Sequence, residues 1–555
     1  MIERFAGAST PNRATVDSAS VKNRSVILLL GAGQFVMVLD SSVMNVSISQ
    51  LVDELDTSVP RIQMAITAYT LVMASLMLVG GKIGDLYGNR KTFVTGLGIY
   101  GVGSLITAIA PNFVVLFLGW SVVEGVGAIL VIPSIAALTA ANYEGRERAL
   151  AYGVLGGIAA AGVAVGPLVG GWVTANLSWR YVFVAETLIV IGIILGARRI
   201  ADSERAGRHG SVDVIGAALS ATGLGCIVFA MLQSSQWGWV NPKRPPTIGG
   251  TEITPFGFSP VFVLALVGAS VLIGFVAWQR HRLTAGAEVL VRLERLRIPQ
   301  LRAGLLALFM QQTVLAGTFF VVPLYLQVVL GYDAFRSGKV LVPLSVCMLA
   351  AARAGPGLLR AHGPRRVVCV GQGAMFVAEM VLLASVDHEM RRVAFALGLA
   401  LLGVGMGLIV SQLGNVVMST ADASTTSETG GLQGTASNLG ASLGTALIGS
   451  LLLTGLAGAF ASEITDRPEI SAEVRGTVER LVDKGVDFVP VSVVEEAASD
   501  AGLPPREVDA IVDAYRASQL RALRSALGAV ALFVIAGLLV TRNLPAKPLE
   551  RRIAA

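Results

Sequence analysis

The segment Gly81-Lys-Ile-Gly-Asp-Leu-Tyr-Gly-Asn-Arg-Lys91 is the most informative feature of the sequence for its fold. It is short, polar and mostly basic, and it lies between two long apolar runs, 62–80 and 92–110. An apolar run of about 20 residues is long enough to cross a hydrocarbon core of about 30 Å as an α-helix. The stretch is therefore predicted to be a tight, glycine-containing connection between two membrane-spanning helices.

The composition of the whole chain predicts many such helices. The chain has 555 residues, of which 54% are hydrophobic and only 14% are charged, whereas soluble domains contain about 25% charged residues. The spans are expected to be helical, because unpaired backbone polar groups cannot be left in lipid. Fourteen spans are predicted, at about 25–51, 62–82, 92–110, 113–138, 149–174, 181–197, 212–232, 260–279, 303–329, 338–359, 367–386, 393–417, 431–459 and 522–541.

The distribution of Lys and Arg predicts the orientation of these spans. An even number of spans puts both ends of the chain on one side, and the loops on that side carry most of the basic residues. By the positive-inside rule this side is the cytoplasm. No cleavage site follows the polar N-terminal residues, so the first span is expected to be a retained signal-anchor. We expect a multi-pass protein of the bacterial inner (plasma) membrane with both termini in the cytoplasm.

An internal repeat predicts how the spans are grouped. Residues 355–366 are a weaker copy of the opening stretch, and they lie eight spans later. If the seventh and eighth spans are an insertion, the two copies occupy the same place in two halves of six spans, which is a transporter architecture. The predicted parts are a cytoplasmic N-tail (1–24), an N-terminal six-helix bundle (25–200), two inserted helices with their loops (201–300) and a C-terminal six-helix bundle (301–555).

Two segments outside the spans have distinct compositions. Residues 460–521 are acidic and are expected to form amphipathic helices that cap the outer mouth, although a solvated connector is an equal alternative. Residues 279–302 are basic and are expected to form a helix lying on anionic lipid at the cytoplasmic side.

Five short motifs resemble the major facilitator superfamily, in particular its fourteen-span drug:proton antiporter branch. They are Leu39-Asp-Ser-Ser42 with Asn45, the opening stretch 81–91, Val165-Gly-Pro-Leu-Val-Gly-Gly171, Ser178-Trp-Arg-Tyr-Val-Phe183, and Tyr325-Leu-Gln-Val-Val-Leu-Gly-Tyr332. The resemblance implies an all-α polytopic fold with two six-helix bundles and two inserted helices. It also implies multidrug efflux by alternating access, driven by the proton gradient.

The chain departs from the family pattern at several charged positions. The fourth-span motif has Ser121 in place of the usual Arg and Glu124 in place of the usual Gln. Glu186 stands where this branch often has Asn, and Arg360 stands in the second connection where the first has its acid. Proton coupling is therefore not expected to use the fourth-span Arg, and acids are expected to take over part of its role.

Four acidic side chains are expected within the spans: Asp40, Glu124, Glu186 and Glu379. An ionisable side chain at the bilayer centre costs about 2.5–3.5 kcal/mol on insertion scales, so such residues are expected to have a function. We interpret them as the proton-coupling residues. The alternatives are a structural hydrogen bond for Asp40, a position at the outer interface for Glu186, and snorkelling from a peripheral span for Glu379.

Further residues are assigned to the substrate cavity, to a conformational latch and to helix packing. The substrate-cavity candidates are the amides Gln34, Asn45, Gln311, Gln312, Gln412 and Asn415, for which hydrogen bonding between helices is the alternative. The latch candidates are Gly81, Asp85, Gly88, Arg90 and Lys91. The candidates for close helix packing or bending are Gly162, Gly166, Pro167 and Gly170, for which static packing is the alternative.

The sequence offers no signature of catalysis: it has no phosphate-binding Gly loop, no His/Cys metal cluster and no nucleophile motif. We therefore expect no enzyme, no metal and no cofactor, with the proton gradient as the energy source. The expected partners of the monomer are small amphipathic substrates, protons and membrane lipids, and not nucleic acid. Two alternatives stay open: a dedicated exporter of a lipid or endogenous metabolite, and a non-transporting receptor or scaffold of the same fold.

Overall fold

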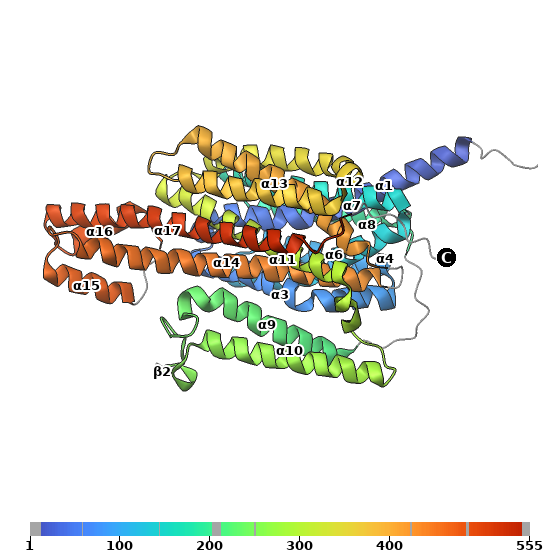
Figure 1. The fold of residues 1–555 in the computed structure, drawn as a ribbon, viewed down its shortest axis with the longest axis horizontal. Coiled ribbons are helices and arrows are strands. Elements are labelled where there is room, and N and C mark those ends of the chain that lie inside the picture. The colour runs from blue at the N-terminus through green and yellow to red at the C-terminus, as the bar shows by residue number, and fades with distance from the viewer. Residues whose placement is uncertain are drawn as a thin grey trace, which may run out of the picture.

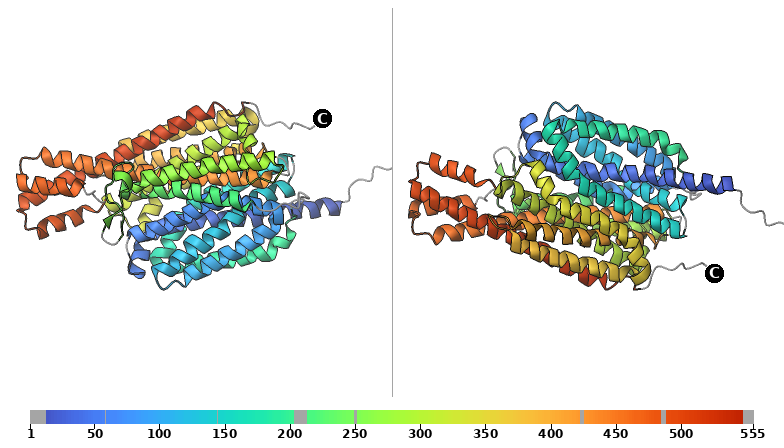
Figure 2. Two further views of the ribbon diagram at one scale, coloured as in Figure 1. Left: turned by 90° about the horizontal axis from the view of Figure 1, so that it is seen from below. Right: turned by 90° about the horizontal axis from the view of Figure 1, so that it is seen from above.

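The fold is that of a computed structural model, and it is described for residues 13–57, 59–143, 145–202, 213–248, 251–421, 425–483 and 488–546. Two bundles of long helices lie side by side, one drawn in blue to cyan and the other in yellow to red in Figure 2. A separate pair of helices, drawn in green, runs along one edge of these bundles (Figure 1). All-helical architecture with two bundles and an inserted pair is the predicted fold class.

The first bundle consists of α1 (Arg13–Val46), α2 (Ile48–Glu54), α3 (Val59–Tyr87), α4 (Asn89–Ala108), α5 (Phe113–Leu116), the π-helix η1 (Phe117–Glu124), α6 (Gly125–Asn142), α7 (Gly145–Asn176), α8 (Arg180–Gly196) and η2 (Ala197–Arg199). The edge pair is α9 (Val214–Trp237) and α10 (Pro260–Thr284), with β1 (Thr247–Ile248), β2 (Thr251–Glu252) and η3 (Pro255–Gly257) between them and η4 (Leu293–Arg297) after them. The two short strands pair antiparallel.

The second bundle consists of α11 (Pro299–Leu324), the π-helix η5 (Tyr325–Val329), α12 (Ala334–Ser385), α13 (Arg392–Met418), α14 (Thr426–Thr465) and α17 (Pro505–Thr541). The short helices α15 (Ala472–Asp483) and α16 (Val491–Asp500) lie with the ends of α14 and α17 at one extremity of the molecule (Figure 1). We call this extremity the cap end. The opposite extremity, where α1 begins and α17 ends, is the tail end.

Thirteen helical segments of the described chain are long and apolar enough to cross a membrane. The remaining predicted span, the third, corresponds to α4, whose 20 residues include glycines, threonines and a serine that lower its hydropathy. The predicted tenth and eleventh spans both lie in α12, on either side of a break at Gly363.

Both predicted connections are breaks at a single glycine. Residues 81–87 continue α3 as helix, and the chain changes direction at Gly88, where φ is 94° and ψ is 133°. In the second bundle the break is at Gly363, where φ is 75° and ψ is 159°. A positive φ is a conformation that glycine adopts without steric cost. The repeat found in the sequence is therefore also a repeat of backbone conformation.

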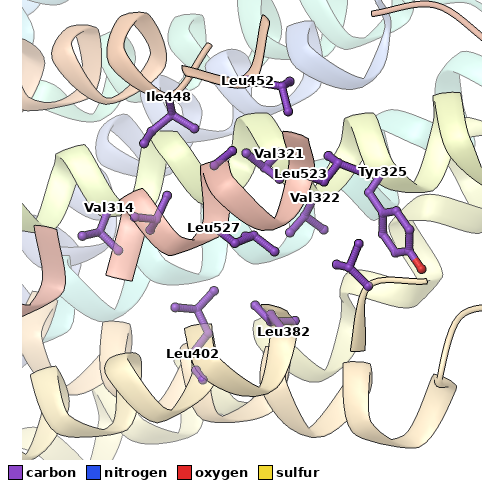
Figure 3. Close-up of a cluster of buried hydrophobic side chains, with 14 of the residues drawn as sticks. Val314, Val321, Val322, Tyr325, Leu382, Leu402, Ile448, Leu452, Leu523 and Leu527 are labelled. Atoms are coloured by element: carbon purple, nitrogen blue, oxygen red, sulfur yellow. The ribbon is translucent and has the colours of Figure 1, made fainter. Parts of the chain in front are cut away.

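Each bundle has its own apolar core. In the second bundle, α11 and η5 contribute Val314, Val321, Val322 and Tyr325, which pack against residues of the neighbouring helices (Figure 3). These neighbours are Leu382, Leu402, Ile448, Leu452, Leu523 and Leu527. A second cluster of the same kind holds α1, α3, α4, η1, α6 and α8 together. Helices in lipid associate through such van der Waals packing.

The predicted packing glycines lie where α7 meets α1. A Cβ atom at Gly162 would be 3.0 Å from Cβ of Val38, and one at Gly170 would be 2.8 Å from Cγ2 of Val43. A Cβ atom at Gly166 would clash with the side chain of Ser42. Pro167 lies within α7, but its side chain is outside the described part of the chain. α7 can therefore approach α1 closely because the face of α7 that meets α1 consists of glycines at these three positions.

The two bundles meet directly near the tail end, through the first turns of α14. A Cβ atom at Gly434 would be 2.6 Å from Cγ of Met77 on α3, and one at Gly430 would be 3.3 Å from Cβ of Ala136 on α6. The start of α14 is therefore wedged between α3 and α6, and the tail ends of the two bundles are closed against each other.

Residues 285–298, between α10 and α11, differ from the predicted surface helix. They contain only the short turn η4, and Leu290 and Val291 are buried against other helices. The prediction of a helix lying on lipid is wrong. It was based on the basic residues of this segment and did not consider the apolar residues between them, which are buried.

Candidate functional site

The structure brings three of the four predicted proton-coupling residues together inside the first bundle. Asp40 lies on α1, Glu124 is the last residue of η1, and Glu186 lies on α8. All three side chains are completely buried. One carboxylate oxygen from each lies within 4.8 Å of the others. We call this group the acid triad.

Asp40 is held by an aromatic donor. The indole Nε1–H of Trp120 donates to both carboxylate oxygens, at 2.8 Å to Oδ1 and 3.0 Å to Oδ2. The indole ring stacks on Tyr69, with ring centroids 4.9 Å apart. Trp120 lies on η1, and π-helical turns of this kind often occur at functional sites. The stack fixes the direction of the N–H group, so Asp40 has a defined orientation.

Glu186 is held by two hydroxyl groups of α4. Tyr100 Oη donates to Oε2 of Glu186 at 3.4 Å, and Ser104 Oγ lies 3.3 Å from the same oxygen. Ser104 also contacts the carbonyl oxygen of Phe183 at 3.1 Å. One carboxylate oxygen of Glu186 is therefore supported, while Oε1 has no hydrogen-bond partner among the described residues.

Glu124 is the least supported member of the triad. Neither of its carboxylate oxygens has a hydrogen-bond partner among the described residues, although the side chain is completely buried. The neighbouring Ser121, which replaces the usual Arg, donates to the carbonyl oxygen of Ala65 at 2.8 Å and ties η1 to α3. The fourth-span motif thus presents an acid without a counter-charge at this position.

Glu379 is buried by itself in the second bundle. It lies on α12 and accepts a hydrogen bond from Thr318 Oγ1 of α11 at 2.8 Å. It therefore does not snorkel. Glu379 lies sixteen residues after Gly363, and Ser104 lies sixteen residues after Gly88. This buried acid of the second bundle thus occupies the position that corresponds to a hydroxyl donor of the acid triad.

By distance alone the acid triad could surround a hard cation, since oxygen ligands of a calcium ion span about 5 Å across the ion. A cluster of acids does not by itself assign a metal, and we assign none.

The amides predicted to line a substrate cavity lie on three helices. Gln311 and Gln412 are buried on α11 and α13, and Gln34, Gln312 and Asn415 are half-buried. The side chain of Asn45 is outside the described part of the chain. The substrate cavity stays a prediction.

The latch residues surround the first glycine break. The backbone N–H of Arg90 donates to Oδ1 of Asp202 at 2.9 Å, and its guanidinium donates to the carbonyl oxygen of Ile200 at 3.2 Å. Gly81 is buried, Asp85 is half-buried and Lys91 is exposed.

The second glycine break makes a related contact. The backbone N–H of Arg365 donates to the carbonyl oxygen of Pro545 at 3.2 Å. Arg365 and Arg90 are each the second residue after their break, and each is bound by the chain that follows the last helix of its own bundle. At each break, a backbone N–H group is therefore hydrogen-bonded to the chain that follows the last helix of the same bundle. The acceptor is a side-chain carboxylate in the first bundle and a backbone carbonyl in the second.

Several residues of the site were not predicted from the sequence. Trp120 was missed because tryptophan in a spanning helix is expected near the interface, whereas this one is buried inside the bundle. Tyr100 and Ser104 are four residues apart on α4, a spacing that places them on one helix face. Two hydroxyl side chains at this spacing in a glycine-rich span could have indicated a polar helix face. The role of Asp202 could not be predicted from the sequence, because Asp202 lies outside the repeated stretch.

Comparisons with known proteins agree with this architecture. Residues 30–445 match the sequence profile of the Major Facilitator Superfamily. Among solved structures, the human organic anion transporter MFSD10 (TETRAN) aligns with a TM-score of 0.55 over 94% of this chain and 99% of its own, at 11% identity.

Three bacterial proteins are similar over most of their length. The probable actinorhodin transporter of Streptomyces coelicolor is 28% identical over 82% of this chain and 77% of its own. The tetracenomycin C resistance and export protein of Streptomyces glaucescens is 25% identical over 95% of this chain and 92% of its own. The multidrug resistance protein Stp of Mycobacterium tuberculosis is 25% identical over 88% of this chain and 84% of its own. The profile match covers most of the spans of both bundles, and the chain is therefore a member of the Major Facilitator Superfamily.

Proposed function

We propose that this protein is a secondary active transporter, not an enzyme, which exports amphipathic small molecules in exchange for protons by alternating access. Export is supported by the names of its relatives, which include an antibiotic resistance and export protein and a multidrug resistance protein. Proton coupling rests on one observation, the buried acid triad of Asp40, Glu124 and Glu186.

The triad has the physical properties of a proton-binding site. Two unit charges about 5 Å apart repel by about 3 kcal/mol at an effective dielectric constant of about 20. Burying a charged carboxylate without a partner adds a further cost. Three ionised acids are therefore unfavourable together, and we infer that the closed bundle holds at least one proton. Glu124 is the proposed carrier, because Trp120 and the α4 hydroxyls support the ionised forms of Asp40 and Glu186.

Alternating access would couple this proton to the substrate. In the proposed cycle, water reaches the triad from opposite sides of the membrane in the two states, so the proton is loaded on one side and released on the other. Interacting acids lose their protons in steps that belong to the group as a whole. Release of one proton therefore changes the hydrogen bonds of all three side chains, on α1, η1 and α8.

We further propose that Gly81, Asp85, Gly88, Arg90 and Lys91 act as a conformational latch. The bond from the Arg90 N–H to Asp202 supports this role, because it connects the α3–α4 break to the end of α8. We place the tail end in the cytoplasm of a bacterial cell, from the distribution of basic residues. The cap end, with α15 and α16, is then outside the cell, and the protein is proposed to act as a monomer.

The proposal can be tested in proteoliposomes with an imposed pH gradient and ethidium, an amphipathic fluorescent cation, as the first probe. The wild type is expected to move ethidium only when the gradient is present. The double variant Asp40→Asn/Glu124→Gln is expected to lose this dependence. Equal gradient-driven flux in both proteins would show that the coupling assignment is wrong.

A dedicated exporter is the second candidate. Two relatives are named for a single compound each, actinorhodin and tetracenomycin C, and a cap over one end of the molecule is more useful for a defined substrate than for many. An export screen would compare the culture medium of a deletion strain with that of its parent. One missing metabolite with unchanged drug resistance would favour this candidate, and no flux of any compound tested would favour a non-transporting role.

A further inference from the structure

The inserted helices α9 and α10 have no role in the proposed transport cycle, yet the segment that follows them lies at the seam between the two bundles. We call this segment, residues 285–298, the strap. Figure 1 shows the green pair α9 and α10 running beside α3 and α14, and α9 contacts both of these helices. The strap follows α10, which packs on α9.

The centre of the strap is apolar and fills the seam. Leu290 and Val291 are buried and pack with Leu78 of α3 and Phe275 of α10. Leu432 of α14 packs against the same cluster. Side chains of the strap are thus inserted between a helix of the first bundle and a helix of the second.

Polar contacts attach the strap to both bundles. Glu288 Oε2 forms an ion pair with Lys82 Nζ of α3 at 2.9 Å. On the other side, the backbone N–H of Arg292 donates to Glu428 Oε1 in the first turn of α14 at 2.8 Å. The guanidinium of Arg295 donates to the carbonyl oxygen of Thr420, after α13, at 2.9 Å. The strap is therefore bonded to the first bundle by one residue and to the second by two.

A buried network fixes the strap to the inserted pair. Gln279 Oε1 of α10 accepts the backbone N–H groups of Leu290 at 2.8 Å and Val291 at 3.4 Å. Its Nε2 donates to Oδ2 of Asp213, which caps α9, at 2.7 Å. The Trp278 indole also donates to Asp213, at 2.9 Å.

This network is charged at neutral pH. Burial disfavours the charged form of Asp213, but hydrogen bonds from Trp278, the Gly216 N–H and Gln279, together with the charge of Arg282, outweigh burial and lower the pKa of Asp213. The carboxylate therefore stays ionised and accepts these hydrogen bonds at neutral pH.

The geometry points to a clasp: we propose that the strap holds the tail ends of the two bundles together and so favours the state in which this end is closed. Separation of α3 from α14 would pull Leu290 and Val291 out of their contacts and break the Lys82–Glu288 ion pair. At the cap end the inserted pair is tied to α14, since Trp239 Nε1 donates to Ser450 Oγ at 3.1 Å. The pair is thus hydrogen-bonded to the second bundle at the cap end, and the Lys82–Glu288 ion pair is the polar contact of the strap with the first bundle that separation must break.

The test measures opening of the tail end directly and needs no substrate. Cys226, Cys347 and Cys369 are replaced by Ala, and Met77→Cys introduces one thiol at the buried contact of α3 with Gly434 of α14. The rate at which a water-soluble maleimide labels this thiol is measured for the full-length protein in nanodiscs. Because both faces are accessible in a nanodisc, the result does not depend on the orientation in the membrane or on proton coupling.

Breaking the ion pair should accelerate labelling. Glu288→Lys is expected to raise the rate about fivefold, the factor that corresponds to an ion pair at the upper end of the exposed range. The charge swap Lys82→Glu/Glu288→Lys should restore the background rate. The matched control is Glu294→Lys, an exposed acid of the same strap, and it should leave the rate unchanged. The clasp is refuted if Glu288→Lys labels no faster than Glu294→Lys, or if the swap stays as fast as the single variant.

A second variant tests whether the inserted pair acts through the strap. Gln279→Met removes the acceptor of the strap's backbone N–H groups and leaves Glu288 and Lys82 in place. Faster labelling is expected, because the strap is then no longer fixed to α10. An unchanged rate would overturn the role of the inserted pair in holding the clasp.

Discussion

The two bundles share a backbone plan but differ in the acids that they bury. The first bundle buries Asp40, Glu124 and Glu186 in one cluster, whereas Glu379 is the buried acid among the described residues of the second bundle. Glu379 has a hydroxyl partner, Thr318, and Glu124 has no partner among the described residues. An isolated acid with a hydrogen bond is sufficient to join two helices, whereas a crowded acid without a partner is suited to exchange a proton. On this difference we propose that coupling belongs to the first bundle and that Glu379 has a structural role.

The largest expected effect is the difference in flux between variants of Glu124 and of Glu379. Glu124→Gln keeps the size of the side chain but removes its ability to carry a proton, and gradient-driven flux should fall by about a hundredfold, the scale of a lost proton-transfer group. Glu379→Gln keeps an oxygen that can accept from Thr318, so flux should stay within about twofold of wild type. Initial rates in proteoliposomes with an imposed pH gradient measure both.

The comparison would be reversed if Glu379→Gln stopped flux and Glu124→Gln did not. Protein yield and oligomeric profile after purification serve as the control for folding, since both substitutions preserve side-chain volume.

A smaller effect is expected from the donor that orients Asp40. Trp120→Phe removes the indole N–H and keeps a ring to stack on Tyr69, so Asp40 loses its partner without a large cavity. Flux should fall by about tenfold, as expected for a hydrogen bond to a charged group. The matched control is Trp172→Phe, since Trp172 of α7 is 49% exposed. Equal flux of the two variants would remove Trp120 from the coupling site.

The sequence predicts the spans and the acids well, because both depend on local composition. Long apolar runs mark the helices, and a charge within such a run is conspicuous. The meeting of Asp40, Glu124 and Glu186 was not predictable from one sequence, because α1, η1 and α8 are far apart in the chain and helix rotation decides which faces meet. The role of Trp120 depends on the same rotation.

The strap was missed for a different reason. Its basic residues dominate the composition of residues 279–302, and two buried residues, Leu290 and Val291, are too few to give a periodic pattern. The position of each glycine break was also uncertain, since the opening stretch contains three glycines and only Gly88 has a positive φ.

The smallest expected effects compare the two breaks. Gly88→Ala and Gly363→Ala each place a side chain at a positive φ, which costs about 1–2 kcal/mol in the free energy of unfolding. Gly88→Ala should be the more destabilising, because its Cβ would also lie 2.9 Å from Oδ2 of Asp202. Thermal unfolding midpoints of the purified variants measure the difference. A larger loss for Gly363→Ala would show that the Asp202 contact adds nothing to the first break.

Counting the protons that move with substrate tests most directly whether Glu124 couples transport to the proton gradient. Proteoliposomes containing a pH-sensitive dye would report the protons that move with a transported compound, either ethidium or a metabolite found by the export screen. Wild type and Glu379→Gln should exchange protons for substrate, whereas Glu124→Gln should move substrate down its own gradient without protons. Proton movement that persists in Glu124→Gln and disappears in Glu379→Gln would contradict the assignment of coupling to the first bundle.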